Sequence, residues 1–591
     1  MDQHPHEHRH DSGPAGHSHG PAGHSHGPAG HSHGPGGHSH GPAEGAVAGP
    51  ELDVEVPDTE LTPAQVARRS FLRGVGLVGA SGAVAGATGL AGASPAAAST
   101  ASARPPRSGD SFRWSAGDHH MHTQYSGGSD APYLIEQHAL HANRFGLDWI
   151  VVTDHGGPLH QKFGVNATYR DIALARQKHT DMLIFQGLEW NPPAGDHSTV
   201  FVPPGTNDLA IMSEFELLYD ASINGNGAST PANEARAREA VRWLGDQVRA
   251  GRTDSALQIF HHPSRGGRYA PSEFRGMRDT EPTVSIGMEG APGHQAAGIP
   301  VSQGGAGEGR GFYDGGPGTN SYPGYPLDSY RTYGGFDWLT STVGGVWDSM
   351  LAEGKPWFVT ATSDSHQVYR DSWTYGGAPT PDGVYKDPVF TRDEVPGRGD
   401  FWPGQYSQTV LGLRDFSYGS VVEALRSGRS YLVHGNLIDG LRLTVSTGGR
   451  RGVGTIGDTV QAARGGRVEV TVSVDLRRTP NFNEDIPQLA RVDLIAGPIT
   501  GPVADQDTMT APGTRVVQSW EVSARQRDAG VAEFTYRFNR DESPLYLRVR
   551  GTDGNRASGG PSGLEPEQDV IGDADPWTDL WFYSNPVFIT R

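Results

Sequence analysis

The region from about Arg104 to about His434 alternates short apolar runs with stretches of helical periodicity. The apolar runs at 149–152, 182–185 and 257–260 predict strands, because each is short and rich in β-branched or aromatic residues. The stretches near 132–145, 231–250 and 340–353 predict helices. Alternating strands and helices are typical of an α/β domain, so we expect one over residues 104–435, with a barrel as one form of it.

The pattern changes from about Leu441 onward. Runs such as 468–472 and 545–549 alternate apolar and polar residues and are separated by Gly, Pro and Asp turns. This pattern predicts a β-sandwich domain over residues 436–591. Within the α/β region, residues 290–335 are rich in glycine, proline and tyrosine, which predicts a long ordered loop of the kind that often covers a site.

The first 67 residues are of low complexity. The unit Gly-Pro-Ala-Gly-His-Ser-His repeats with minor variation every seven residues from Gly13 to His40, and four further histidines precede it. Proline and glycine at this density cannot bury a core, so we expect a disordered tail over residues 1–67. Two interpretations of its imidazoles stay open: loose binding of zinc or nickel, and sequence drift without a function.

Residues 68–103 resemble a twin-arginine export signal. Arg68 and Arg69 precede a weakly apolar run from Gly74 to Ala93, and a small-residue cleavage site follows at 101–103. The resemblance implies the twin-arginine export machinery as a partner and a secreted or cell-surface location. The alternative is an uncleaved membrane helix, but glycine and alanine fill the run, so we expect no stable membrane span.

Charge and cysteine content narrow the chemistry. The chain has 48 basic and 67 acidic residues, a net charge of −19, and no visible basic patch. We therefore expect no nucleic-acid partner, and a small molecule or a metal as the ligand. The chain has no cysteine, which excludes thiolate zinc sites, disulfides and iron–sulfur clusters. Any metal must be held by histidine and carboxylate.

Histidines and carboxylates gather where the predicted strands end. His120 and His122 lie two residues apart, so on an extended segment both point to the same side. Such a pair alone is more often a surface accident than a ligand pair. The ends of later strands add His155, Glu189, His197, His262, Asp364 and His366. Barrel enzymes collect their catalytic groups at strand ends, whereas alternation should turn His119 and His261 away from the metal.

These motifs, over residues 117–366, closely resemble the polymerase-and-histidinol-phosphatase (PHP) superfamily. The resemblance implies a distorted (β/α)7 barrel. It also implies two or three divalent metal ions, with ligands as follows: His120, His122, Glu189 and Asp364 for one, bridging Glu189 with His197 and His262 for a second, and His155 and His366 at a third position. The family's Tyr-Ser-Asp-Gly is here Tyr125-Ser126-Gly127-Gly128, so the third position lacks an acid, for which Asp130 is a candidate substitute.

Three further motifs resemble the carbaryl-hydrolase-like group of PHP proteins. They are Gly345-Val346-Trp347-Asp348, the segment at 424–430, and the ending at 581–586. Because these motifs carry no chemistry of their own, they indicate relatives without naming a substrate.

The donor types indicate hydrolysis. Histidine nitrogen and carboxylate oxygen suit zinc, manganese or iron, and a bridging Glu189 can hold two ions about 3.5–4 Å apart. Such a pair generates hydroxide at neutral pH for attack on phosphorus or an acyl carbon, with Asp364 and Glu189 acting through the ions. Arg265 and Arg268 are candidates for binding a substrate phosphate, or else ordinary surface or ion-paired arginines. His294 could enter from the long loop, although a loop histidine with its own partners is favoured.

The sequence therefore predicts an exported metal-dependent hydrolase of ester bonds. A phosphoesterase for a small phosphorylated compound comes first. A hydrolase of carbamates or carboxylic esters is the alternative. A non-catalytic, metal-binding extracellular protein is the third hypothesis, and the complete set of ligands for two metals argues against it.

Overall fold

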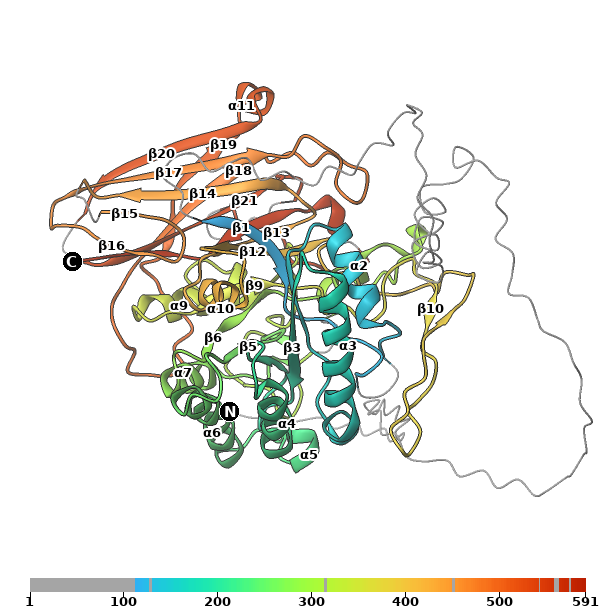
Figure 1. Ribbon diagram of the computed structural model, residues 1–591. Helices are drawn as coiled ribbons and strands as arrows, with labels where there is room; N and C mark the ends of the chain where they lie inside the picture. The colour runs from blue at the N-terminus through green and yellow to red at the C-terminus, as the bar shows by residue number, and fades with distance from the viewer. Residues whose placement is uncertain are drawn as a thin grey trace, which may run out of the picture. The chain divides into compact units, whose positions relative to one another are not determined.

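The computed structural model describes residues 112–126, 130–312, 316–448, 452–540, 543–556, 563–572 and 575–591. These residues form a mixed α/β structure with one large mixed sheet and three smaller sheets (Figure 1). The predicted histidine-rich tail at 1–67 and the predicted export signal at 68–103 lie outside the described residues.

Seven strands of the large sheet follow one another in chain order. Six are mutually parallel, and β4 is inserted antiparallel between β3 and β5. The seven strands are β1 (Arg113–Asp118), β2 (Trp149–Val152), β3 (Leu183–Trp190), β4 (Ser198–Phe201), β5 (Leu257–Phe260), β6 (Ser285–Ala291) and β9 (Phe358–Ala361). The strands predicted at 149–152 and 257–260 are confirmed residue for residue, while β4 was not predicted.

The two ends of this seven-stranded row meet without a regular ladder. Met121 and Ser365 form an isolated parallel bridge, and the Thr409 hydroxyl bonds both the N–H and the C=O of Ala361. Asp118 explains the irregularity, because its carboxylate accepts from the backbone N–H groups of His120 and Ser363 at 3.0 and 2.9 Å. Peptide groups that bond a side chain cannot continue a strand ladder. The arrangement therefore departs from a regular (β/α)7 barrel both at this junction and at β4.

Helices cover this part of the sheet. They are α2 (Ile135–Arg144), α3 (Val165–Lys178), α4 (Asp208–Tyr219), α5 (Ala221–Asn224), α6 (Pro231–Arg249), α7 (Pro271–Thr280), α8 (Trp338–Ser341), α9 (Val346–Ala352) and α10 (Tyr418–Arg426). The longest, α6, begins at Thr230, whose hydroxyl accepts from Asn233 N–H, and has proline in its first turn. Its buried residues Ala237, Ala240, Val241 and Leu244 follow helical spacing, so one face packs on the core.

The C-terminal strands form two packed sheets. One is a separate antiparallel sheet of β14 (Ile438–Ser446), β15 (Val453–Gly454), β17 (Arg467–Leu476) and β20 (Val531–Asn539). Along β17, Val468, Val470, Val472 and Val474 are buried and alternate with more exposed residues. They share a hydrophobic core with Val549 and Phe582 of the large sheet. A sandwich with one face of β17 buried is what the alternating sequence predicted.

The second layer of this sandwich continues the large sheet that contains β1 to β6 and β9. The link runs from β1 through β12 (Ser407–Leu413) and β13 (Ser430–His434) to β22 (Trp581–Ser584). The remaining strands of this layer are β16 (Thr459–Gln461), β18 (Arg491–Pro498), β19 (Arg515–Glu521), β21 (Leu545–Thr552) and β23 (Val587–Thr590), and α11 (Ala524–Ala529) follows β19. The large sheet thus crosses the boundary that the change of pattern near residue 436 suggested.

Short elements fill the connections. They are the hairpins β7 (Thr332–Tyr333) with β8 (Phe336–Asp337) and β10 (Trp373–Thr374) with β11 (Val389–Phe390), and the turns η3 (His160–Gly164), η4 (Arg265–Gly267), η5 (Gln295–Gly298), η6 (Val301–Gln303), η7 (Arg310–Phe312) and η8 (Pro576–Thr578). In the described part of the 290–335 loop, Ala296, Ile299 and Tyr325 are buried. The prediction of an ordered loop with packed aromatics is confirmed there.

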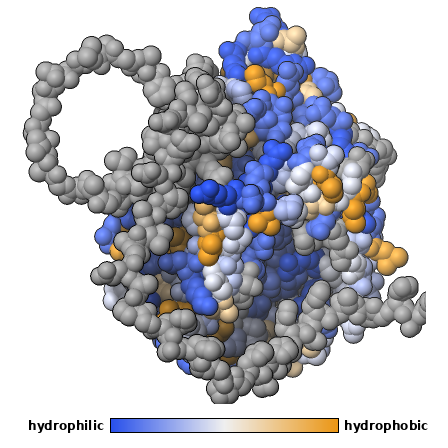
Figure 2. Space-filling model, turned by 90° about the vertical axis from the view of Figure 1, so that its right-hand side faces the viewer, coloured by the Kyte–Doolittle hydropathy of each residue, from blue (hydrophilic) through white to orange (hydrophobic). Residues whose placement is uncertain are grey.

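In the view of Figure 2, hydrophilic residues dominate the surface, and several apolar groups lie among them. Across the described ranges, no helix has both the length and the apolar character needed to cross a membrane.

Candidate metal centre

The histidines and carboxylates predicted from the strand ends lie together in the structure. Glu189 is near the end of β3, and His262 and Asp364 follow β5 and β9. Ligand-type atoms of His120, His122, Glu189 and Asp364 all lie within 4.8 Å of one another, and all four residues are buried. The same limit holds for the groups of His155, Glu189 and His197, and of Glu189, His261 and His262. Parallel strands bring these residues to one end of the sheet, although they are far apart in sequence.

Glu189 is the centre of this arrangement. Its Oε1 lies 3.0 Å from His120 Nε2, 2.9 Å from His197 Nδ1 and 3.5 Å from His262 Nε2. Its Oε2 lies 3.4 Å from His122 Nε2 and also contacts His155 Nδ1. One buried carboxylate therefore faces imidazoles on both of its oxygens, which is the geometry of a bridging ligand.

Asp364 is the second carboxylate of the centre. Its Oδ1 lies 2.9 Å from His120 Nε2, 3.2 Å from His122 Nε2 and 3.3 Å from His366 Nδ1. The backbone of Asp364 has φ of 45°, and that of His262 has φ of 25°, in the left-handed region that residues with a side chain avoid. Strain of this kind is found where the surrounding structure holds a functional group in place.

A third group lies beside the first two. His122, His155 and His366 have ring nitrogens within 4.8 Å of one another. Asp130 Oδ2 lies 3.2 Å from His155 Nε2 and 3.8 Å from His366 Nε2. Asp130 is thus placed where the third metal position would need its missing acid.

Buried partners orient these side chains from behind. Glu289 accepts from His120 Nδ1 at 2.7 Å, from Thr362 Oγ1 at 2.7 Å and from the backbone N–H of His262 at 2.6 Å. Both ring nitrogens of His119 face threonine hydroxyls, as expected of a supporting residue. The expectation that His261 turns away is wrong in one respect, because its Nδ1 lies 2.8 Å from Glu189 Oε1. His261 therefore helps to hold the bridging carboxylate.

The charges of the centre depend strongly on one another. Burial alone would raise the pKa of Glu189, but His197 and His155 outweigh burial and hold that pKa well below its usual range. Burial likewise opposes a charge on His120, yet Asp364 and Glu289 raise the pKa of His120 well above its ordinary value. Burial lowers the pKa of His262 to about 4, with Arg265 acting in the same direction. Several pKa values shifted by burial and by neighbouring charges within one cluster are typical of functional sites.

The donor set fits divalent metal ions. His120 Nε2 and His122 Nε2 face each other at 3.2 Å, as do His155 Nε2 and His366 Nε2. Glu189 Oε2, Asp364 Oδ1 and both ring nitrogens of His262 are buried and make no well-directed hydrogen bond to the described residues, although imidazole nitrogens lie against both carboxylate oxygens. Buried polar atoms in this state are costly, and a shared cation between imidazoles and carboxylates removes the cost. Nitrogen and oxygen donors of this type suit zinc, manganese or iron.

The two predicted phosphate-binding arginines have different surroundings. Arg265 binds Asp196 through Nε at 3.1 Å and Nη2 at 2.7 Å, and its Nη2 lies 3.3 Å from His197 Nδ1. Arg268 donates to the carbonyl of Gly227 at 2.7 Å. Among the described residues, no hydrogen bond or ion pair joins Arg268 to the histidines. Arg265 is therefore at the centre but already partly neutralised, and Arg268 is anchored to a loop.

His294 belongs to the centre, contrary to the favoured expectation of a loop histidine with unrelated partners. Its Nε2 lies 2.9 Å from Asp364 Oδ2, and its Nδ1 bonds Asp400. Neither residue had a strong sequence signal, because His294 lies in the long glycine-rich loop after β6 and Asp400 lies between β11 and β12, away from the ends of the parallel strands. The centre is partly exposed to solvent on one side. The side chains there are 15–35% exposed, and they are those of Asp130, His155, His197, Arg265, His294 and His366.

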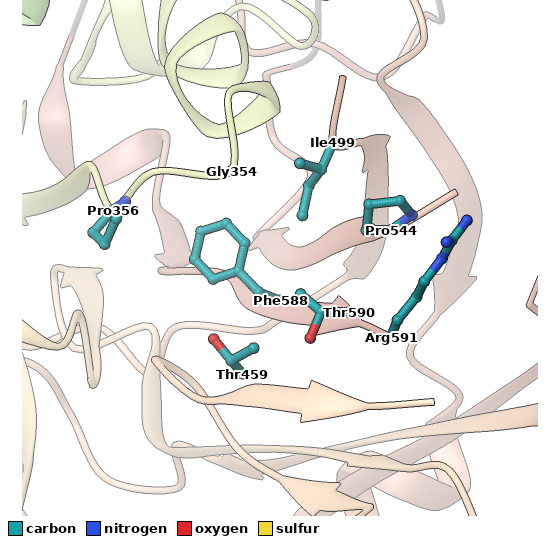
Figure 3. A pocket seen from close by; sticks show the side chains of 8 residues that line it. All are labelled: Gly354, Pro356, Thr459, Ile499, Pro544, Phe588, Thr590 and Arg591. Carbon is teal, nitrogen blue, oxygen red and sulfur yellow. The ribbon is translucent and has the colours of Figure 1, made fainter. Parts of the chain in front are cut away.

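A pocket elsewhere has a different character (Figure 3). It encloses about 430 Å³ beside β23 and is lined by Gly354, Pro356, Thr459, Ile499, Pro544, Phe588, Thr590 and Arg591. This lining contains neither histidine nor a carboxylate side chain, so it offers no metal ligand of the predicted type.

Comparisons with known proteins give structural likenesses of low similarity. No protein-family model matches the chain, and no curated protein is significantly similar to it. The chain is similar to a two-domain protein from Bacteroides vulgatus containing a predicted PHP-like metal-dependent phosphoesterase, with 14% identity, coverage of 78% of this chain and 94% of that one, and a TM-score of 0.31.

Two other solved structures show still weaker likeness. One is a predicted metal-dependent phosphoesterase from Bifidobacterium adolescentis, with 13% identity, coverage of 29% and 76%, and a TM-score of 0.17. The other is a lesion-specific endonuclease from Pyrococcus furiosus, with 11% identity, coverage of 53% and 56%, and a TM-score of 0.24. These TM-scores are too low to support an argument about family or activity. The functional argument therefore rests on the centre itself.

Proposed function

We propose that this protein is a divalent-metal-dependent hydrolase of the PHP type that acts on ester bonds, with phosphate esters of small molecules as its first candidate substrates. The observation that carries the proposal is Glu189, a buried carboxylate with imidazoles on both oxygens. Asp364 adds a second buried carboxylate beside His120 and His122. The carbaryl-hydrolase-like subgroup remains a proposal that rests only on the motifs near 345–348, 424–430 and 581–586.

Each group of residues has a distinct task in this proposal. His120, His122, Glu189 and Asp364 would hold one ion, Glu189 with His197 and His262 a second, and His155 and His366 with Asp130 a third. Two or three such ions, of zinc, manganese or iron, would supply Lewis acidity and a nucleophile at neutral pH. Glu289, His119 and His261 keep the ligands in place from the buried side. The substrate would approach from the open side, past His197 and Arg265.

The ester class depends on how Arg265 is used. Its Nε and Nη2 bind Asp196, while its Nη1 makes no hydrogen bond within the described residues. A guanidinium so placed favours an anionic phosphate ester. Neutralisation by Asp196 favours the alternative, a neutral carbamate or carboxylic ester. A non-catalytic metal-binding role is a third candidate, which the open side of the centre argues against.

A substrate panel tests the activity and the ester class together. We expect protein loaded with manganese or zinc to hydrolyse phosphomonoesters or phosphodiesters faster than aryl esters and carbamates. Arg265→Lys should raise KM for a phosphate ester about 10- to 100-fold, through loss of about 1.5–3 kcal/mol of charge-assisted hydrogen bonding from Nη1. It should change KM little for a neutral ester. Arg268→Lys tests whether Arg268, the second candidate, also binds the substrate phosphate.

Arg252→Lys is the control for the general effect of replacing an arginine, because Arg252 pairs with Glu214 on the surface. If neutral esters are the better substrates and Arg265→Lys leaves every KM unchanged, the ester or carbamate hydrolase replaces the phosphoesterase. If no ester is cleaved with any of the metals, the non-catalytic alternative is favoured.

Export is a separate proposal. Arg68 and Arg69 would direct the protein, already folded and metal-loaded, to the twin-arginine machinery, because a centre assembled from distant strand ends forms only on folding. Replacing both arginines by lysine should retain the protein in the cytoplasm, measured by fractionation and immunoblotting. Continued export of the variant would contradict the assignment of this signal.

A further inference from the structure

We infer that His294 and Asp400 are positioning residues that fix Asp364 with one carboxylate oxygen toward the metal ligands and the other held back. This inference rests on the proposed metal centre and adds two residues to it. The residues come from outside the parallel strands: His294 from the long loop after β6, and Asp400 from the segment between β11 and β12.

The two oxygens of Asp364 have different neighbours. Oδ1 faces His120 Nε2 at 2.9 Å and His122 Nε2 at 3.2 Å, which places it among the ligands. Oδ2 faces His294 Nε2 at 2.9 Å. A carboxylate held in this way would present a single oxygen to a bound ion instead of rotating to chelate it with both. His294 thus determines which oxygen of Asp364 is offered.

Asp400 fixes His294 in turn. Its Oδ1 bonds His294 Nδ1, so carboxylates hold both nitrogens of the ring. Its Oδ2 accepts from the backbone N–H groups of His366 at 2.6 Å and Gln367 at 2.5 Å. Asp400 is 2% exposed. A single buried carboxylate therefore sets the position of His294 and of the segment that carries another proposed ligand, His366.

The backbone shows how closely the loop and the ligand segment are fitted. His294 has φ of 53° and Asp364 has φ of 45°, so both residues of the contact adopt left-handed conformations. Gly293 makes the approach possible, because a Cβ at this position would lie 2.1 Å from Asp364 Cβ. The N–H of His294 also donates to the carbonyl of Ser363 at 3.3 Å.

A buried network anchors the loop on its other side. Gln295 Nε2 donates to the carbonyls of Pro292 and Gly335 at 2.7 and 3.0 Å. Gln295 Oε1 accepts from Arg310 Nε at 2.8 Å, and both side chains are buried. The loop therefore presents His294 from a fixed support, as a positioning role requires.

The test measures metal binding in the full-length protein. We expect His294→Ala and Asp400→Asn each to weaken manganese binding at the centre about 10- to 100-fold, the usual effect of losing a residue that orients a ligand. His294→Gln should restore most of the affinity, because its amide N–H can replace Nε2–H. Titration calorimetry gives the dissociation constant, and electron paramagnetic resonance of bound manganese reports the change in coordination.

The matched control is His179→Gln, because His179 pairs with Glu136 between two helices. His179→Gln should leave both the dissociation constant and the resonance spectrum unchanged. The histidine-rich tail is the same in every variant. Asp400→Asn is isosteric, so it tests the inference even if His294→Ala fails to fold. Unchanged affinity and spectrum in the variants, with weakened binding in Asp364→Ala, would overturn the positioning role alone. If Asp364→Ala also binds manganese like the wild type, both the role and the proposed metal centre are wrong.

Discussion

Replacing Asp364 by alanine is expected to abolish hydrolysis while leaving the fold largely intact. The side chain contacts His120, His122 and His366 through one oxygen and His294 through the other, so it holds charge in place and does not fill the core. Loss of an ion that contributes several kcal/mol to the transition state corresponds to a rate lower by about 10³-fold or more. Steady-state kinetics, with circular dichroism as the check on folding, measures both effects.

His197→Ala should act in the same way, because His197 contacts Glu189, the proposed bridging ligand. Asp382→Ala, at an exposed position between β10 and β11, is the control for replacing an aspartate and should retain full activity. Full hydrolysis by Asp364→Ala would show that the reaction takes place elsewhere.

The largest expected effect on stability is at Asp348, on the helix α9. Its carboxylate binds Arg548 of β21 through two hydrogen bonds of 3.0 and 2.7 Å, and both side chains are fully buried. Tyr546 Oη and the backbone N–H of Gly344 bond the same carboxylate at 3.1 and 2.7 Å. Asp348→Ala leaves the Arg548 charge buried without its partner. We expect the free energy of unfolding to fall by about 3–5 kcal/mol, measured by urea denaturation.

The control for Asp348 is Glu469→Ala, which removes an exposed pair with Arg537 across β17 and β20. Exposed pairs contribute about 0.2–1 kcal/mol, so this variant should unfold near the wild-type midpoint. Equal stability of the two variants would contradict the view that α9 and β21 are joined by a buried ion pair.

Local patterns predicted the elements well where one face of an element is buried. The periodicity of α6 and the alternation along β17 each record a single buried face. The histidines and carboxylates could also be collected from sequence, since parallel strands place their ends together. The grouping of these residues around a bridging Glu189 came from the family resemblance of the motifs and not from the strand ends.

Other features depend on contacts that no local pattern records. His294 and Asp400 are 106 residues apart, and Asp196 and Arg265 are 69 residues apart. The pairing of β13 with β22, which carries the large sheet across the sequence boundary, joins residues near 432 to residues near 583. Alternation of apolar and polar residues shows that a strand has two different faces, but it does not show which strand pairs with its edge. The antiparallel β4 escaped prediction because it begins with Ser198 and Thr199, so it forms no apolar run like the one at 149–152.

The location of bound metal tests the central claim most directly, because the histidine-rich tail can also bind ions and metal content alone cannot separate the two. Anomalous diffraction from crystals loaded with manganese or zinc gives that location. We expect one peak among His120, His122, Glu189 and Asp364, and a second among Glu189, His197 and His262. Well-ordered crystals with anomalous peaks only outside these residues, or with none, would contradict the account.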